Sequence, residues 1–535
     1  MNRKTSLAFW VGAPLAMLVG AGLVPAFLDA QSASLAPGKM PRIGTVDERF
    51  QSFNIEMVEV TGGRFWKPYG QQGEAPPPAP PVAGRPGSNQ PVGMNPALFE
   101  YRPPIDLTNP RLRKLAAALG PAYVRVSGTW ANSTYFQDSG EAAPATPPPG
   151  FNGVLTRQEW RGVIDFSHAV DAKIVTSFAI SAGTRDAAGV WTPQQARQLL
   201  AYTKSVGGSI AAAEYMNEPN IAGIGGAPKG YDAAAYAHDF AVFRPFIKQA
   251  APEMIILGPG SVGEGGLLPL TMPGMLKSED ILKATGPVFD AFSYHFYGAV
   301  SQRCAGMSLT AGTTAAAALS EEWLSRTLRT EAYYAGLRDK FVPGRALWLN
   351  ETADAACGGN PWGSTFLDSF RFLNQHGSLA QRGVQVIAHN TLASSDYGLL
   401  DQKTYAPRPN YWAALLWRKF MGTTVLNPGP SPAESLHLYA HCLRGVPGGV
   451  ALLAINADRA AAHSVDLATE AQRYTLTADK LEDTRVQLNG SELRLGSNDD
   501  LPPLSGLPTQ PGRLTFAPAS ITFLAIANAG NATCR

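Results

Sequence analysis

Eight short apolar runs recur along the first three quarters of the chain, and segments with helical character separate several of them. Those segments cover residues 193–205, 232–249, 320–340 and 365–376. Near-continuous apolar runs are typical of parallel strands buried on both faces, and their alternation with helices indicates β/α units. Eight such units predict an α/β fold, the (β/α)8 TIM barrel. The runs lie at 53–60, 122–126, 173–180, 209–216, 254–257, 291–296, 346–349 and 384–390.

The pattern changes beyond about residue 423, where short alternating runs are separated by turns at a spacing typical of all-β structure. We therefore predict a catalytic barrel over 53–422 and a C-terminal β-sandwich domain over 423–535. Residues 34–52 are expected to be a linker with a possible strand contribution to the sandwich. A stretch dense in Pro and Gly near 70–97 predicts an exposed insertion in the barrel.

The first residues read Met-Asn-Arg-Lys and are followed by a long apolar stretch and then by small residues. This pattern is typical of a signal peptide, which we predict over residues 1–33. An uncleaved membrane anchor is the alternative, because the apolar stretch is long for a signal peptide. In both cases the remaining chain is exported, and the protein is periplasmic, secreted or membrane-anchored. A membrane contact is expected only if the segment stays uncleaved.

The composition is that of a globular protein, with 45% hydrophobic and 16% charged residues. The formal net charge is only +2, and no basic run is present that could neutralise a nucleic-acid backbone. Nucleic acid is therefore excluded as an expected partner. The composition leaves the oligomeric state open.

Four cysteines allow three disulfide pairings in an exported protein, and four reduced thiols are the alternative. Cys442 and Cys534 both lie in the strand-rich C-terminal region, so a bridge between them is favoured. That bridge leaves Cys304 and Cys357 in two loops that can face each other. No CxxC spacing occurs, and no metal site is expected.

Two glutamates follow the fourth and seventh apolar runs, in Asn217-Glu218-Pro219 and in Asn350-Glu351-Thr352. Reacting groups of barrel enzymes stand at the C-terminal ends of the strands. A retaining glycosidase needs two carboxyl groups about 5 Å apart, one protonated and one ionised. A single glutamate at a strand end is more often a solvated residue, but Pro219 marks the end of its strand and a second glutamate is present. The pair therefore favours catalysis.

Five motifs, in this order, resemble the heparanase-like family 79 glycoside hydrolases of clan A, which include β-glucuronidases. The similarity continues to residues 410–412 and 438–442 and to Cys534, whose bridge to Cys442 resembles the C-terminal disulfide of that family. It covers most of the chain from about Phe53, except for the Pro-rich insertion. The motifs are YVRVSGT (123–129), NEPN (217–220), HFY (295–297), WLNET (348–352) and YGLLD (397–401).

The resemblance implies a function for each matching residue. Glu218 is expected to be the general acid/base and Glu351 the nucleophile, with Asn217 near the 2-hydroxyl of the sugar and Tyr297 near the nucleophile. A glucuronate carboxylate is expected to bind Tyr397 and the backbone amides of Gly358 and Gly359. Cys357 departs from the family, which has a glycine at this position. His295 either orients the substrate or a carboxylate, or is a structural histidine.

These observations predict a retaining β-glucuronidase that acts by double displacement on a glucuronate-containing carbohydrate and needs no cofactor. The absence of a strong basic cluster favours removal of a terminal glucuronate over internal cleavage of a sulfated polysaccharide. One alternative is a clan A hydrolase for a neutral sugar, of the xylosidase or arabinofuranosidase type. Another is an exported carbohydrate-binding protein without turnover.

Overall fold

A computed structural model describes residues 33–69, 95–266, 274–307 and 313–535 of the chain. The predicted signal peptide, apart from its last residue, and most of the predicted Pro-rich insertion lie outside the described residues. None of the helices in the described ranges is long and apolar enough to span a membrane.

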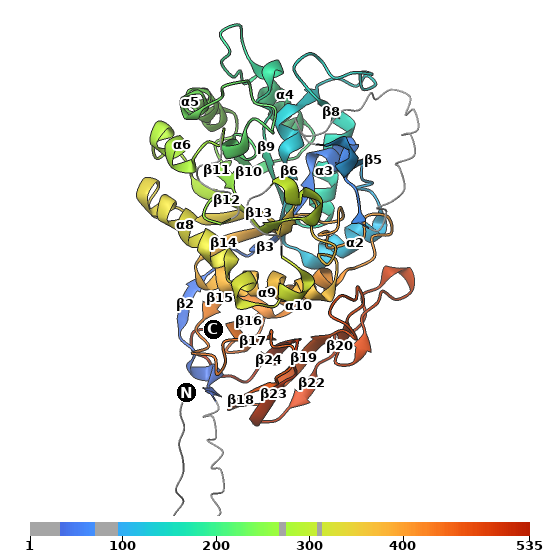
Figure 1. The fold of residues 1–535 in the computed structure, drawn as a ribbon, viewed down its shortest axis with the longest axis vertical. Coiled ribbons are helices and arrows are strands. Elements are labelled where there is room, and N and C mark those ends of the chain that lie inside the picture. Colours follow the sequence, from blue (N-terminus) through green and yellow to red (C-terminus); the bar gives the residue numbers. More distant parts are fainter. Residues whose placement is uncertain (1–32, 70–94, 267–273, 308–312) are drawn as a thin grey trace, which may run out of the picture.

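Eight parallel strands close into a barrel in the order β3-β6-β9-β10-β11-β12-β13-β14, and helices surround it (Figure 1). Each of the eight apolar runs supplies one of these strands in sequence order, so the predicted TIM barrel is confirmed. The barrel strands are β3 (Gln51–Glu56), β6 (Ala122–Ser127), β9 (Ala172–Ser177), β10 (Ile210–Glu214), β11 (Ile255–Val262), β12 (Ala291–Val300), β13 (Leu347–Ala356) and β14 (Val384–His389).

Several of the barrel strands differ in length from the predicted runs, and two of these differences affect the site. Strand β3 ends at Glu56, because Glu56 and Glu59 form a capping box that starts the short helix α1 (Met57–Thr61). Strand β13 does not end near Glu351 but continues to Ala356, paired with β12 as far as Val300. Glu351 therefore lies inside an extended two-strand ladder, which gives its backbone more hydrogen-bonded support than a loop would.

The helices contact the outside of the barrel, as α3 does at β9, α8 at β12 and α9 at β14. The predicted helix over 320–340 is two helices, with Ser325 between them. The helices are α2 (Pro110–Leu119), α3 (Arg157–Ala169), α4 (Gln194–Ser205), α5 (Ala233–Ala250), α6 (Ser278–Thr285), α7 (Glu321–Leu324), α8 (Arg326–Phe341), α9 (Phe366–Gln381) and α10 (Pro409–Phe420).

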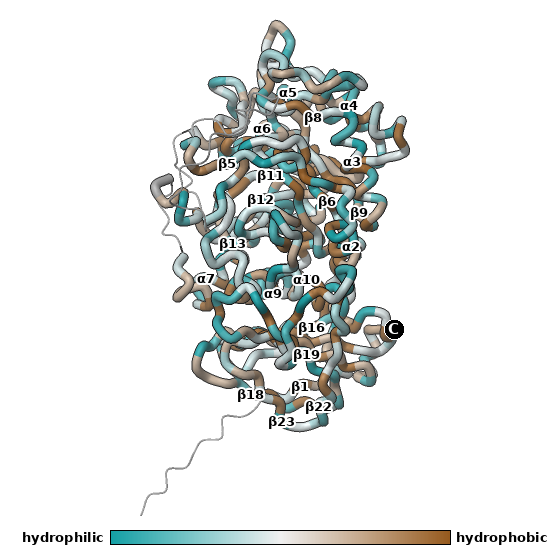
Figure 2. The backbone as a smooth tube through the Cα atoms, turned by 90° about the vertical axis from the view of Figure 1, so that its right-hand side faces the viewer, coloured by the Kyte–Doolittle hydropathy of each residue, from teal (hydrophilic) through white to brown (hydrophobic). Residues whose placement is uncertain are grey.

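Below the barrel, a nine-stranded sheet and a three-stranded sheet enclose a separate apolar core (Figures 1 and 2). Leu35, Val465 and Leu514 of the smaller sheet and Leu452 and Leu524 of the larger one contribute to that core. The C-terminal strands are β15 (Met421–Leu426), β16 (Leu436–Leu443), β17 (Val450–Asn456), β18 (His463–Leu467), β19 (Ala471–Thr477), β20 (Gln487–Leu488), β21 (Ser491–Glu492), β22 (Leu507–Thr509), β23 (Gly512–Phe516) and β24 (Ser520–Ile526).

Two strands that precede the barrel in the sequence belong to these C-terminal sheets. Strand β1 (Ala33–Leu35) pairs with β18, and β2 (Arg42–Thr45) pairs with β15. The two C-terminal sheets, which we call the lower module, are therefore assembled from strands that lie before and after the barrel in the sequence.

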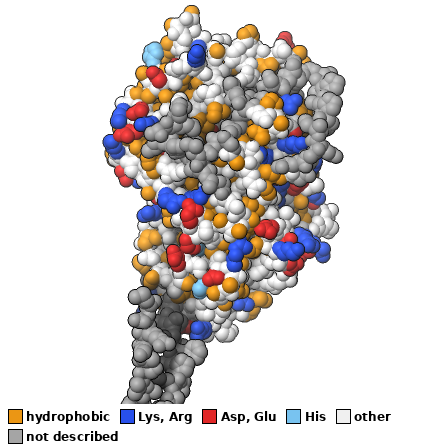
Figure 3. Space-filling view, viewed as in Figure 1, with side chains coloured by type: hydrophobic (Ala, Val, Ile, Leu, Met, Phe, Trp, Pro, Cys, Tyr) orange, Lys and Arg blue, Asp and Glu red, His pale blue; other side chains and the backbone are white. Residues whose placement is uncertain are grey.

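Charged side chains of both signs are interspersed on the face of the molecule that Figure 3 shows.

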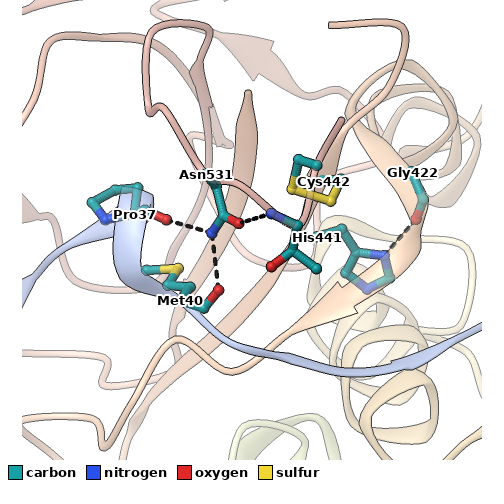
Figure 4. Close-up of a disulfide and its surroundings, with 8 residues drawn as sticks. Pro37, Met40, Gly422, His441, Cys442 and Asn531 are labelled. Carbon is teal, nitrogen blue, oxygen red and sulfur yellow. Dashed lines mark hydrogen bonds between the residues drawn. A yellow bond between two sulfur atoms is a disulfide. The ribbon is translucent and has the colours of Figure 1, made fainter. Parts of the chain in front are cut away.

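In the lower module a disulfide joins the last residues of the chain to β16, and an asparagine joins them to the N-terminal segment 37–40 (Figure 4). Cys442 of β16 is bonded to Cys534, as predicted. The side-chain amide of Asn531 donates hydrogen bonds to the carbonyls of Pro37 (2.8 Å) and Met40 (2.9 Å). A second disulfide joins Cys304 and Cys357, so all four cysteines are paired.

Candidate active site

The predicted site residues converge at the carboxyl-terminal face of the barrel, where parallel strands direct their last side chains together. Glu218 follows β10, His295 and Tyr297 belong to β12, and Glu351 belongs to β13. His295 and Glu351 are register partners on neighbouring strands. These four side chains are buried, so each polar atom depends on protein or ligand partners.

The backbone holds Glu218 in a left-handed conformation at the start of a short 3-10 helix, with φ of 48°. Two hydrogen bonds fix the residue before it: Asn217 donates its N–H to Oδ1 of Asn132 (2.8 Å), and Nδ2 of Asn132 donates to the Asn217 carbonyl (2.9 Å). A non-glycine residue adopts this conformation only when its surroundings impose it. The turn at Pro219 thus aims Glu218 back at the barrel centre, where Oε1 lies 3.2 Å from Nδ1 of His295.

Both oxygens of Glu351 are engaged. The hydroxyl of Tyr297 donates to Oε1 (2.6 Å), and Nη1 of Arg125 donates to Oε2 (2.6 Å). Nη2 of Arg125 also donates to Oε2 of Glu214 (2.9 Å) and to Oδ1 of Asn217 (2.7 Å). One guanidinium therefore orients both Glu351 and the residue that precedes Glu218.

One oxygen of Glu218, one of Glu351 and one ring nitrogen of His295 all lie within 4.8 Å of one another. By spacing alone, these three atoms could hold a metal ion. Arg125, however, already donates to Oε2 of Glu351, and a second cation there would meet its charge at low dielectric. The arrangement is better suited to two carboxyl groups that act on one bound molecule.

The surroundings of the two glutamates shift their pKa values in opposite directions. Burial raises the pKa of Glu218, and the charge of Glu351 adds to this effect against a hydrogen bond from His295. Burial also opposes ionisation of Glu351, but His295, Arg125 and the Tyr297 hydroxyl outweigh it and lower the pKa. The site therefore favours a protonated Glu218 beside an ionised Glu351.

His295 is part of this charge network rather than an isolated structural histidine. Burial opposes its protonation, but Glu351 and Glu214 outweigh burial and raise the pKa of His295 to about 9. Its Nδ1 faces Glu218, and its Nε2 lies 3.5 Å from Oε1 of Glu214. His295 thus contacts two carboxylates, and its role in orienting them stays a prediction.

Tyr397 lies on the same face, beside the side chains that hold Glu351. Nδ2 of Asn390 donates to the hydroxyls of Tyr297 (3.0 Å) and Tyr397 (3.2 Å) and to Oε1 of Glu56 (3.1 Å). The backbone position of Tyr397 is fixed by His389, whose Nε2 bonds to the Tyr397 carbonyl (2.8 Å). Burial lowers the pKa of His389 to about 3, so the ring is neutral and Nε2–H is the donor.

The predicted glycine pair lies next to Tyr397. A Cβ on Gly359 would come within 3.2 Å of the Tyr397 ring, and one on Gly358 would lie 2.6 Å from Cβ of Trp66. Both glycines have positive φ, at 80° and 86°, so only glycine allows this close approach. Within the described residues, neither of their N–H groups donates a hydrogen bond. Two amides that donate to no other described residue thus lie next to Tyr397, whose hydroxyl shares Asn390 with Tyr297, a partner of Glu351.

Several residues of the site were missed in the sequence, among them Arg125, Glu214, Asn390 and Glu56. Arg125 lies within the YVRVSGT motif, and a charged residue inside an otherwise apolar buried run was the available signal. Glu56 ends the first barrel strand, and a glutamate at a strand end was the signal that singled out Glu218. Nothing in the sequence pattern distinguishes Asn390 from any other polar residue after a strand.

Asp354 is buried in β13 below the glycine pair, where one oxygen accepts the N–H of Asn360 (2.8 Å). Burial, together with the charge of Asp368, raises the pKa of Asp354 to about 7. A raised pKa stabilises the fold fully below the unfolded value near 3.8, and this contribution is lost as pH rises through about 7. The isosteric substitution Asp354→Asn removes that loss.

We therefore expect Asp354→Asn to gain about 2 °C or more in Tm relative to the wild type between pH 4 and pH 7.5. Differential scanning calorimetry of both proteins across that range measures the difference. Asp280→Asn on the surface of α6 is the control and should show no such gain, since its side chain is 54% exposed. If the difference in Tm between Asp354→Asn and wild type stays constant across this pH range, the raised pKa of Asp354 is contradicted.

A closed (β/α)8 barrel with one buried glutamate after its fourth strand and another in its seventh has the architecture of the clan A glycosidases. The sequence profile of glycosyl hydrolase family 79, N-terminal domain, matches residues 104–377, about half of the chain. The chain belongs to this family and is heparanase-like.

Relatives with known names agree with this membership. Heparanase-like protein 1 of Arabidopsis thaliana is 28% identical over 372 residues, which cover 66% of this chain and 65% of the plant protein. The chain thus spans slightly less than two thirds of that relative. Heparanase of Bos taurus is 27% identical over 83% of this chain and 88% of its own length. Baicalin-beta-D-glucuronidase of Scutellaria baicalensis is 31% identical over 36% of this chain and 39% of its own length.

Solved structures resemble the fold over nearly the whole chain. A 4-O-alpha-L-rhamnosyl-beta-D-glucuronidase from Fusarium oxysporum matches with a TM-score of 0.60 at 11% identity, over 92% of this chain and 99% of its own. The GH51 arabinofuranosidase from Xanthomonas axonopodis pv. citri matches with a TM-score of 0.58 at 16% identity, with the same coverage. At these identities the likeness shows the fold alone.

Proposed function

We propose that the protein is a retaining glycoside hydrolase that removes β-linked glucuronic acid. The observation that carries this proposal is the pair of buried carboxyl groups with opposite pKa shifts, whose oxygens lie within 4.8 Å. Carboxyl groups about 5 Å apart suit a double displacement, whereas inverting enzymes need about 6.5–9.5 Å to admit a water.

In the first step, ionised Glu351 attacks the anomeric carbon while Glu218 transfers its proton to the leaving oxygen. Arg125 and Tyr297 keep the attacking carboxylate ionised and fixed in one orientation. A glucuronyl ester of Glu351 results, and the aglycone leaves with the proton. The negative charge of Glu351 is thereby removed, so the pKa of Glu218 falls.

In the second step, Glu218, now a carboxylate, takes a proton from water, and the oxygen of that water attacks the anomeric carbon. Glu351 leaves as a carboxylate, Glu218 is protonated again, and the configuration of the sugar is retained. The side-chain amide of Asn217 donates no hydrogen bond to another described residue, which supports a contact with the 2-hydroxyl.

The carboxylate of the sugar is proposed to bind the hydroxyl of Tyr397 and the amides of Gly358 and Gly359. Neutral donors suit this site, because they can hold an anion without changing the charge balance at Glu218 and Glu351. A sequence relative supports this substrate class, since it is a baicalin-beta-D-glucuronidase. The formal net charge of only +2 favours a terminal sugar over a long sulfated chain.

The two disulfides support export, because disulfides persist in oxidising compartments. We therefore propose that the residues before β1 are an export signal or an anchor; Ala33, the last residue of the predicted segment, belongs to β1. We also propose the barrel over 53–422 as the catalytic domain and residues 423–535, joined by β1 and β2, as its β-sandwich companion.

The first test is hydrolysis of 4-nitrophenyl β-D-glucuronide by the protein without residues 1–32, compared with the matching glucoside and xyloside. The proposal requires turnover of the glucuronide in excess of both neutral sugars. Preference for the xyloside would instead assign the same two glutamates to a neutral-sugar hydrolase. No turnover of any of the three by a folded protein would favour a carbohydrate-binding function.

Tyr397→Phe removes the proposed phenolic donor and keeps the ring that packs on Gly359. We expect kcat/KM for the glucuronide to fall about 10- to 100-fold, because a hydrogen bond to a charged group is worth about 1.5–3 kcal/mol. Any neutral glycoside that is turned over should change less than about threefold. Equal losses on charged and neutral substrates would remove carboxylate recognition from Tyr397. Tyr405→Phe, a partly buried tyrosine outside the site, is the matched control.

A further inference from the structure

The segment 301–304, which follows β12, is attached to both parts of the chain that carry the proposed carboxylate-binding groups. One part is residues 357–359, after β13, and the other is Asp396 with Tyr397, after β14. The segment is distant in sequence from both parts, with a separation of 53 between Cys304 and Cys357. We call segment 301–304 the clasp.

The clasp is attached to the glycine segment covalently and by hydrogen bonds. Cys304 is bonded to Cys357, and the Ser301 hydroxyl donates to the Cys357 carbonyl (3.1 Å). The N–H of Ser301 donates to the Ala356 carbonyl (3.1 Å). These contacts fix the position of Cys357, the residue immediately before Gly358.

Cys357 needs this support, because its φ is 62° and a residue with a side chain rarely adopts that conformation. It begins a run of three left-handed residues that continues through Gly358 and Gly359. Glycines lose the most conformational freedom when they are ordered, so the run does not hold its shape by local preference. The covalent attachment at its first residue restricts the directions in which the two following N–H groups point.

Arg303 attaches the clasp to the Tyr397 segment. Its guanidinium forms an ion pair with Asp396, the neighbour of Tyr397, and donates to the Lys67 carbonyl. It also stacks on the Tyr69 ring, 3.9 Å from the centroid. Arg303 and Asp396 are largely buried, so this pair is less screened by solvent than a surface pair. The N–H of Asp396 in turn donates to the Gly358 carbonyl (3.1 Å), which completes a closed ring of contacts.

We infer that the clasp is a specificity-determining element: the Cys304–Cys357 disulfide and the Arg303–Asp396 pair together position the Gly358 and Gly359 amides against Tyr397 for a carboxylate ligand. The clasp residues themselves act through the residues that they position. This inference rests on the proposed function for the identity of the ligand. The geometry of the ring of contacts does not depend on it.

The test uses the double variant Cys304→Ser/Cys357→Ser and the single variant Arg303→Gln, which releases the other attachment. We expect KM for 4-nitrophenyl β-D-glucuronide and the inhibition constant of free D-glucuronate to rise about tenfold, with kcat changed less than about threefold. We expect KM to change more than kcat because Glu218 and Glu351 lie outside the clasp. Cys442→Ser/Cys534→Ser is the matched control and should leave both constants unchanged.

Hydrogen–deuterium exchange provides a readout that needs no turnover. Peptides that contain residues 357–360 and 396–398 should exchange faster in both clasp variants than in wild type, and peptides around Glu218 should not. Unchanged exchange in these peptides, or an unchanged KM in the folded double variant, would overturn the inference. If the wild type does not hydrolyse glucuronides at all, the proposed function fails and exchange alone decides whether the clasp positions the site.

Discussion

We expect Glu351→Gln to lower kcat/KM for an aryl glucuronide by about 10⁴-fold or more, because the amide keeps the shape of the nucleophile and cannot form the sugar ester. Tyr297 and Arg125 hold both oxygens of Glu351, so the smaller change to glutamine preserves the surroundings better than alanine does. Steady-state kinetics with a chromogenic glucuronide measure the loss. Circular dichroism and Tm establish that the variant is folded.

The stereochemistry of chemical rescue gives Glu351 a stricter test. In Glu351→Gly, sodium azide can occupy the vacated space and attack the anomeric carbon directly. One displacement in place of two should give the α-glucuronyl azide, which NMR distinguishes from the β form. Rescue to the β product, or wild-type turnover by Glu351→Gln, would refute its assignment as nucleophile.

Glu218→Gln is expected to show a loss that depends on the leaving group. An alkyl glucuronide needs protonation of its leaving oxygen, so its kcat/KM should fall about 10²–10⁴-fold, the usual contribution of general acid catalysis. A dinitrophenyl glucuronide, whose leaving group needs no proton, should lose much less in glycosylation. The difference between the two substrates, measured under identical conditions, isolates proton donation from damage to the site.

The pH dependence of kcat/KM tests independently whether Glu218 is the general acid. In wild type, kcat/KM should fall at low pH as Glu351 is protonated and at high pH as Glu218, whose pKa is raised, loses its proton. The high-pH decline should disappear in Glu218→Gln with the dinitrophenyl substrate. If the decline persists unchanged, another group is the general acid.

The order of the barrel strands could be predicted from the sequence because buried parallel strands leave an unmistakable apolar signature. The residues at which the strands end could not be predicted in this way. Strand β13 continues past Glu351 through Ala353 and Ala355, small residues whose strand character depends on pairing with β12. Strand β3 stops at Glu56 because of a capping box between two buried glutamates, which reads as an alternating strand when the sequence is viewed alone.

The predicted site residues were recognised because motifs fix them in sequence, and the structure brings them together. The groups that the sequence did not single out act across the barrel. Arg125 gains its importance from contacts with Glu214, Asn217 and Glu351, each on a different strand or loop. Such a role depends on closure of the sheet, which no local pattern encodes.

The pairing of β2 with β15 has a consequence for the order in which the protein can fold. Thr45 is synthesised about 375 residues before Met421. At a synthesis rate of about 5–20 residues per second, roughly 20–75 s pass between the synthesis of β2 and that of its partner strand β15. During that interval, the ribosome delivers the whole barrel while β1 and β2 have unpaired edges. The barrel can close first, but the lower module can be completed only after the C-terminus has emerged.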